Sequence, residues 1–162
     1  MYRTSPQPST LVFTCAGNVV TAWERATGRP AWHHEVPRIE NQFSDRMRCV
    51  VSGDRVLVVA LGPMPSGFFA SPSGVTTVTC LSHDDGRVLW QTPMGPPMNF
   101  GHFAPTLLVD EDLVLVTSAG FVFALGLEDG RARWESAVPG LSARDHHAVG
   151  VMTRSGAAQA DR

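Results

Sequence analysis

Lysine is absent from the sequence, and all 13 basic residues are arginine. The 15 acidic residues nearly balance them, so the formal net charge is −2, and neither sign gathers into a run. Nucleic acids and anionic membranes attract basic patches. The composition therefore gives no electrostatic case for either partner, and the exclusive use of arginine is as typical of a GC-rich genome as of any function.

Long apolar runs are also missing. No segment approaches the ~18 consecutive apolar residues of a membrane-spanning helix. The N-terminal stretch MYRTSPQPST lacks the apolar core of a secretory signal. The sequence thus predicts no membrane span and a cytoplasmic location. A periplasmic location is the alternative, for a mature chain whose signal has been removed.

Cysteine is scarce. Cys15, Cys49 and Cys80 each stand alone inside a predicted strand, at no spacing typical of metal ligands. We expect them to be buried free thiols. A nucleophile, a base and an orienting group are not recognisable as a set, so no catalytic residue, metal ligand or cofactor is assigned.

The sequence does contain a unit that occurs three times. Each copy begins with a small residue, has Gly-Arg at the same offset and ends in tryptophan: AWERATGRPAW (22–32), CLSHDDGRVLW (80–90) and ALGLEDGRARW (124–134). Glycine supplies the positive φ of a hairpin turn, and tryptophan supplies a large packing surface. The predicted structural motif is therefore Gly28, Trp32, Gly86, Trp90, Gly130 and Trp134.

The spacing of the copies predicts a propeller. In the third copy, the segment 113–134 reads as strand, turn, strand, turn and a short final strand, which is typical of an antiparallel meander. The step from Trp90 to Trp134 falls within the roughly 40–50 residues of a four-stranded blade. The longer step from Trp32 to Trp90 implies an insertion, which we place at 62–74 (GPMPSGFFASPSG).

These copies resemble the blades of the PQQ-like (quinoprotein-type) β-propeller family, whose signature is Ala-x-Asp-x-x-Thr-Gly-x-x-x-Trp. The first copy matches it at Ala22, Thr27, Gly28 and Trp32. The second copy matches at Gly86 and Trp90, and the third at Ala124, Gly130 and Trp134. The Asp position departs from the signature, being Glu24, Ser82 and Gly126. The resemblance covers most of residues 10–153 and implies a fold, because the signature belongs to blade packing and not to an activity.

We therefore predict an all-β chain of three antiparallel four-stranded propeller blades at 10–153, with a flexible arm at 1–9 and a flexible tail at 154–162. The first blade lacks its innermost strand, and the segment 147–153 (HAVGVMT) is a spare strand that could complete it. Because natural propellers have roughly four to eight blades, we expect two chains to form a six-bladed homodimeric ring by exchanging this strand. A fragment of a longer propeller, a subunit of a mixed ring and another small β fold are the alternatives.

The irregular sequence gathers in connections that should share one face of the ring, at 35–45, 62–74, 92–103 and 136–146. Loops on a rigid scaffold often carry function. The partner-binding candidates on this face are Met64, Phe68, Phe69, Met98, Phe100, His102, Phe103 and His146. Phe68 and Phe69 could equally fold back over the blade edge, and His102, His146 and His147 could instead be metal ligands.

The function predicted from these observations is a non-catalytic scaffold that binds a protein or peptide through its loop face. A small-molecule or metal-binding module is the alternative. The family resemblance also implies quinone-dependent dehydrogenases, which resemble this chain in blade signature but use a longer ring, calcium-binding carboxylates and adjacent cysteines near the cofactor. No adjacent cysteine pair occurs here, which disfavours that activity.

Overall fold

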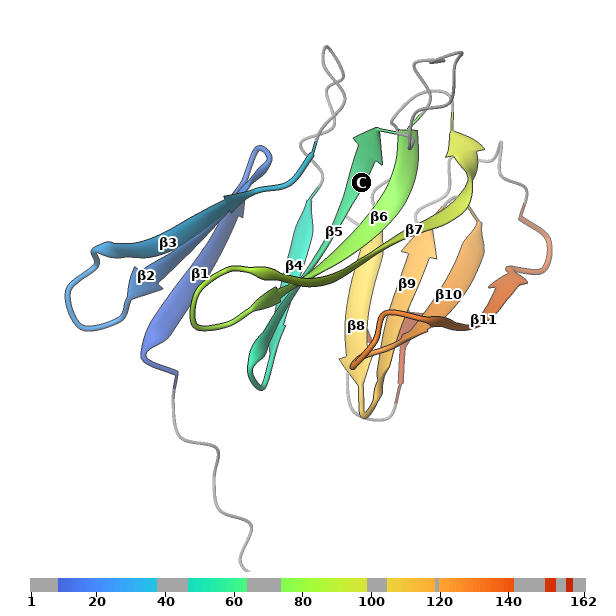
Figure 1. Cartoon of the computed structure of the whole chain (residues 1–162). Helices are drawn as coiled ribbons and strands as arrows, with labels where there is room; N and C mark the ends of the chain where they lie inside the picture. Colours follow the sequence, from blue (N-terminus) through green and yellow to red (C-terminus); the bar gives the residue numbers. More distant parts are fainter. Residues whose placement is uncertain are drawn as a thin grey trace, which may run out of the picture.

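Three antiparallel sheets follow one another along the chain (Figure 1). The computed structural model describes residues 9–37, 47–63, 74–98, 105–118, 120–141, 151–153 and 157–158. None of these residues forms a helix, and so none forms one with the length and apolarity that crossing a membrane requires. The predicted all-β architecture of propeller blades is confirmed.

Within each sheet, every strand pairs with the next one in sequence. The first blade contains β1 (Leu11–Ala16), β2 (Val19–Glu24) and β3 (Pro30–Glu35). The second contains β4 (Arg48–Ser52), β5 (Arg55–Pro63), β6 (Gly74–Ser82) and β7 (Val88–Met98). The third contains β8 (Thr106–Asp110), β9 (Leu113–Ser118), β10 (Phe121–Gly126) and β11 (Ala132–Ala137). Short strands β12 (Val151–Met152) and β13 (Ala157–Ala158) pair with each other.

Among the described residues, no strand pairs with the free edge of β1, so the first blade lacks its innermost strand there, as predicted. The innermost strands of the second and third blades, β4 and β8, lie close together. The first sheet has no such strand before β1 among the described residues. The spare C-terminal strand does not fill this place within the chain, because β12 pairs with β13 and both lie against β8 in the third blade. The second blade separates that position from the open edge of β1. The predicted completion of the first blade is therefore not made inside one chain.

Strand β7 is longer than the sequence indicated. The segment from Thr92 onward was expected to form a loop, but the strand continues to Met98. Prolines are tolerated because β7 is the outermost strand of its sheet and has a ladder partner on one side only. Its register against β6 shifts near Gly74, where the ladder passes the proline-rich stretch.

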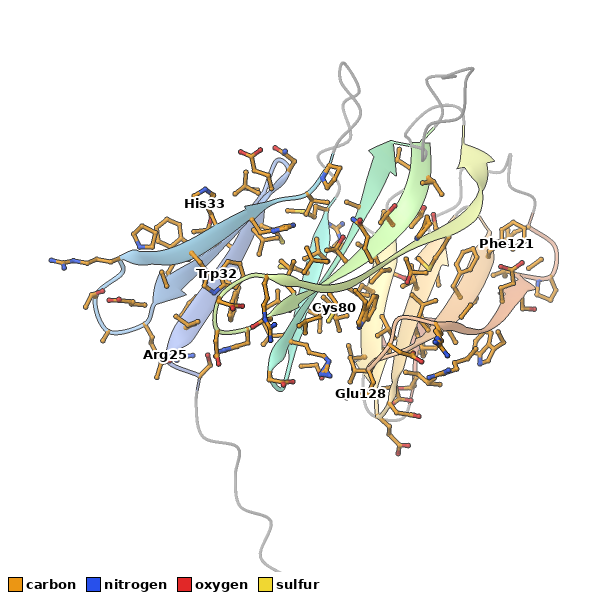
Figure 2. The ribbon with its side chains drawn as sticks, in the orientation of Figure 1. Arg25, Trp32, His33, Cys80, Phe121 and Glu128 are labelled. Carbon is orange, nitrogen blue, oxygen red and sulfur yellow. The ribbon has the colours of Figure 1, made fainter. Side chains whose placement is uncertain are left out.

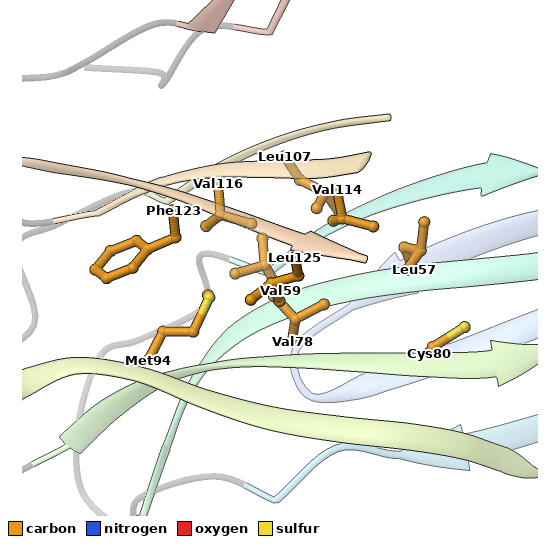
Figure 3. Packing of buried hydrophobic residues seen from close by; sticks show 10 residues of the cluster. All are labelled: Leu57, Val59, Val78, Cys80, Met94, Leu107, Val114, Val116, Phe123 and Leu125. Carbon is orange, nitrogen blue, oxygen red and sulfur yellow. The ribbon is translucent and has the colours of Figure 1, made fainter. Parts of the chain in front are cut away.

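The core lies between the blades in two layers. One layer packs the first blade on the second through Val20, Val56, Val58 and Leu81, with Phe13 and Trp32 against it. The other packs the second blade on the third through ten residues that include Leu57, Val59, Val78, Val114, Phe123 and Leu125 (Figure 3). Alternate residues of β5 thus face opposite neighbours, which explains its continuous apolar run. Each fully buried valine or leucine contributes about 1.5–3 kcal/mol.

Candidate functional site

The three Gly-Arg turns share one backbone geometry. Gly28, Gly86 and Gly130 have φ values of 69, 70 and 64°. Each glycine N–H donates to the carbonyl oxygen four residues earlier, on Glu24, Ser82 and Gly126, at 2.8, 3.0 and 2.9 Å. A β-carbon is strained in this conformation, so the repeated glycine is a backbone requirement, as predicted.

The residue before each glycine fixes the turn. Thr27 Oγ1, Asp85 Oδ1 and Asp129 Oδ1 each accept a hydrogen bond from the N–H of the following arginine, at 3.2, 3.2 and 3.0 Å. The N–H of Arg131 is the main cause that holds the pKa of Asp129 below its usual range. The preference for Thr or Asp at this position therefore has a direct hydrogen-bonding cause.

Two of the three departures from the signature Asp, Glu24 and Gly126, have local contacts of their own. A β-carbon at Gly126 would overlap Asp129 and Arg133, which form an ion pair with Nη2 3.1 Å from Oδ1. In the first copy, Glu24 Oε2 accepts a hydrogen bond from Thr27 Oγ1 at 2.5 Å. Each turn thus keeps its geometry with a different set of side chains.

The tryptophans that end the first two copies of the repeat, Trp32 and Trp90, each pack on the glycine turn of the next blade. Trp32 of the first blade covers Gly86, and Trp90 of the second covers Gly130, so closely that a β-carbon on either glycine would overlap the indole ring. Figure 2 shows Trp32 facing the β6–β7 turn. The sequence predicted the residues of this motif, but not that tryptophan and glycine meet across neighbouring blades.

Hydrogen bonds complete both docking contacts. Trp32 Nε1 donates to the carbonyl of His83, and Trp90 Nε1 donates to the carbonyl of Leu127, each at 3.0 Å. Both acceptors lie three residues before the docked glycine. Thr92, two residues after Trp90, adds a bond from Oγ1 to the carbonyl of Gly130 at 2.7 Å.

The docking series is open at both ends of the chain. A β-carbon at Gly28 would have no neighbour within 4 Å among the described residues, although the turn has the docking conformation. At the other end, the side chain of Trp134 is 47% exposed. Arg25 occupies the acceptor position before Gly28, and Ser136 occupies the position that Thr92 has after Trp90. We call these the open glycine end and the open tryptophan end.

A family model now places this geometry among known proteins. The model of the family described as outer membrane protein assembly factor BamB, a PQQ-type repeat family, matches residues 3–156. The chain belongs to this family. Its match covers all three turns and both open ends.

Solved structures share the fold of this BamB-family chain. BamB from Moraxella catarrhalis is 24% identical, with a TM-score of 0.52 over 78% of this chain and 33% of that one. A europium-containing methanol dehydrogenase is 15% identical, with a TM-score of 0.55 over 80% and 23%. Quinohemoprotein alcohol dehydrogenase from Comamonas testosteroni is 17% identical, with a TM-score of 0.54 over 79% and 19%. The chain therefore spans a third or less of these structures. No curated protein matches it.

Family membership does not decide the activity of this chain. A named assembly factor and two dehydrogenases share its fold, and at these identities the similarity shows the fold alone. The family description names the outer membrane, so the predicted cytoplasmic location is not supported.

The predicted partner-binding side chains lie outside the described residues: Met64, Phe68, Phe69, Phe100, His102, Phe103 and His146. The backbone of Met98 ends β7, but its side chain is likewise not described. The described strand ends beside these segments are neighbours, because Gly74 pairs with both Pro63 and Met98. Pro63, Gly74 and Met98, the described residues next to these segments, therefore lie at the same end of the second blade.

One hydrogen-bonded chain of polar side chains was not predicted. Ser9 Oγ lies 2.7 Å from Nε2 of His83, whose Nδ1 lies 2.8 Å from Oδ1 of Asp84. The His83 ring also packs edge-on against Phe13, with centroids 5.2 Å apart. Ser9 Oγ is also held by the backbone of Leu11, and the Asp84 side chain is 90% exposed. These hydrogen bonds therefore hold the start of the first blade against the second.

We expect Ser9→Ala to lower the free energy of unfolding by about 1 kcal/mol, because it removes the hydroxyl that bonds His83. Urea denaturation measures this loss, and Val88→Ala, at a valine that is 47% exposed, is the control.

Serine hydrolases also contain a serine, a histidine and an aspartate that are hydrogen-bonded in this order. Covalent labelling of Ser9 by a fluorophosphonate would contradict a purely structural role.

Proposed function

We propose that this chain is a non-catalytic interaction module that supplies three blades to a propeller ring, and that a second copy of the chain supplies the other three. The observation that carries the proposal is the interrupted docking series. Two tryptophans are seated on glycine turns, one tryptophan is exposed and one turn of the same conformation is empty.

A second copy fits both open ends because each chain carries both halves of the contact. Trp134 of one copy would cover Gly28 of the other, and the same contact would recur on the opposite side of a two-fold axis. The resulting six blades lie within the roughly four to eight of natural propellers. The contact needs no exchange of the C-terminal strand, so it is compatible with the pairing of β12 and β13.

The internal contacts define what the new contact would contain. Trp134 Nε1 would donate to the carbonyl of Arg25, as Trp90 does to that of Leu127. Ser136 would donate to the carbonyl of Gly28, as Thr92 does to that of Gly130. The exposed face of the first blade would be covered at the same time. Val12 is 43% exposed there, whereas Val114 at the same place in the third blade is fully buried.

The assembled ring would present its loops to a protein partner. The family description of an assembly factor supports a protein partner and a place at the outer membrane. The described strand ends beside the candidate loops, Pro63, Gly74 and Met98, are neighbours, which supports one shared surface. Phe68, Phe69, Phe100 and Phe103 are the aromatic anchors that we propose for it.

Co-purification of an untagged copy with a tagged copy tests the proposal. We expect the tagged wild type to capture an untagged copy, and Gly28→Ala to abolish this capture, because a β-carbon there would block the seat of Trp134 as it would at Gly86. Gly53→Ala is the matched control, since Gly53 has a φ of 58° and is also open. Both variants carry the same backbone strain of about 1 kcal/mol. Equal capture by both variants, or none by the wild type, would contradict the proposed contact.

A further inference from the structure

Two cysteines meet at the junction of the first and second blades. Cys15 lies on β1 and Cys49 lies on β4, and their sulfur atoms are 2.6 Å apart. Figure 1 shows these two strands beside each other. Both side chains are only partly buried. They are free thiols, as predicted, but they are neither fully buried nor isolated, because the fold joins positions 34 residues apart.

Their environment makes the two sulfurs unequal. The Cys49 thiol donates a hydrogen bond to Cys15, and this bond, with a smaller contribution from Arg48, lowers the pKa of Cys15 to about 7. The same bond and burial raise the pKa of Cys49. At neutral pH, about half of the Cys15 side chains are therefore thiolates, the form that attacks disulfides, and Cys49 supplies the second thiol.

We propose that Cys15 and Cys49 form a disulfide that locks the first blade to the second when the chain meets a small-molecule disulfide oxidant. The Cys15 thiolate attacks one sulfur of the oxidant, forming a mixed disulfide and releasing one thiolate. Cys49 then loses its proton and attacks the Cys15 sulfur, which releases the second thiolate. Two protein thiols are oxidised, one oxidant disulfide is reduced to two thiols, and the Cys49 proton and one from water or buffer neutralise them.

The position of the bond gives it a structural consequence. Sulfur atoms 2.6 Å apart need to approach by only about 0.6 Å to reach the S–S bond length of roughly 2.05 Å. The bond would close a loop that includes β2 and β3 and would hold β1, the open edge of the first blade, against β4. Closing a loop of this size should raise the midpoint of thermal unfolding by about 5–15 °C.

Cys80 serves as an internal control. It is fully buried in the layer between the second and third blades, and burial raises its pKa to about 11. Figure 2 marks its place on the ribbon. It should therefore remain a thiol under conditions that join the other two.

The test treats the full chain with oxidised glutathione or with dithiothreitol, then unfolds it and counts thiols by alkylation and intact mass. We expect one alkylated thiol after oxidation and three after reduction, with Cys15 and Cys49 linked in the peptide map. The Cys80→Ser variant should keep the bond and the rise in melting temperature, and Cys49→Ser should lose both. Three thiols after oxidation, a link to Cys80, or glutathione left on Cys15 would overturn the proposal.

A second readout does not depend on the variants folding. In the reduced wild type, the rate of Cys15 alkylation by iodoacetamide should rise with pH through a midpoint near 7, as the thiolate fraction increases. A midpoint near the ordinary value of about 8.5 would show that the two sulfurs do not interact as described. These thiol measurements are independent of whether the ring assembles.

Discussion

Replacing Trp90 with alanine should lower the free energy of unfolding by about 3–5 kcal/mol. The indole packs on the core layer between the second and third blades, covers Gly130 and donates to the carbonyl of Leu127. Its loss leaves a cavity and an unpaired carbonyl at the same place. Urea denaturation of the wild type and the variant measures the difference.

Gly130→Ala probes the same contact from the other side. The substitution adds a β-carbon that would overlap the Trp90 ring, together with the strain of positive φ. Gly53→Ala adds the same strain in a turn with open space and is the matched control. We expect Gly130→Ala to be more destabilising than Gly53→Ala by about 1–3 kcal/mol. Equal losses would show that Trp90 is not seated on this turn.

Replacing Trp134 with alanine should weaken the association of two chains by about a thousand-fold or more. A buried tryptophan at the centre of an interface is worth roughly 2–4 kcal/mol, and a two-fold ring contains this contact twice. Because about 1.4 kcal/mol changes a dissociation constant tenfold, the two losses together reach that factor. Sedimentation equilibrium over a range of concentrations measures the dissociation constant.

Two comparisons make the Trp134 result specific. Val88 is also 47% exposed but lies outside the docking series, so Val88→Ala should leave the dissociation constant unchanged. Ser136→Ala should weaken association by about tenfold, since it removes one hydrogen bond from each of two contacts. An unchanged constant for Trp134→Ala would contradict the proposed interface.

The fold was predictable because its repeat is local. The repeat places glycine at a fixed offset from tryptophan, with Thr27, Asp85 or Asp129 before the glycine. This pattern predicts a turn, because the hydrogen bonds of the turn lie within a few residues. Successive side chains of β5 likewise face two different apolar layers, so the strand is a continuous apolar run that the sequence shows directly. Such features depend on neighbours in sequence, and the structure confirmed them.

The candidate site was less predictable because its contacts cross blades. The position of Trp32 in its own copy does not reveal that it covers Gly86, and nothing in the spacing of Cys15 and Cys49 indicates that β1 and β4 bring them together. The repeat itself contained one signal that could have predicted the open ends. If each tryptophan docks forward, the last one and the first glycine must be left open. The loop residues, Phe68 and His102 among them, remain predictions.

The absolute mass of the chain in solution shows directly whether two copies associate into one ring. Light scattering on a size-exclusion column, repeated over a range of loading concentrations, gives the mass without assuming a shape. We predict twice the chain mass of 17.5 kDa for the wild type, and 17.5 kDa for Trp134→Ala at the same loading. A folded wild-type monomer at every concentration would contradict it.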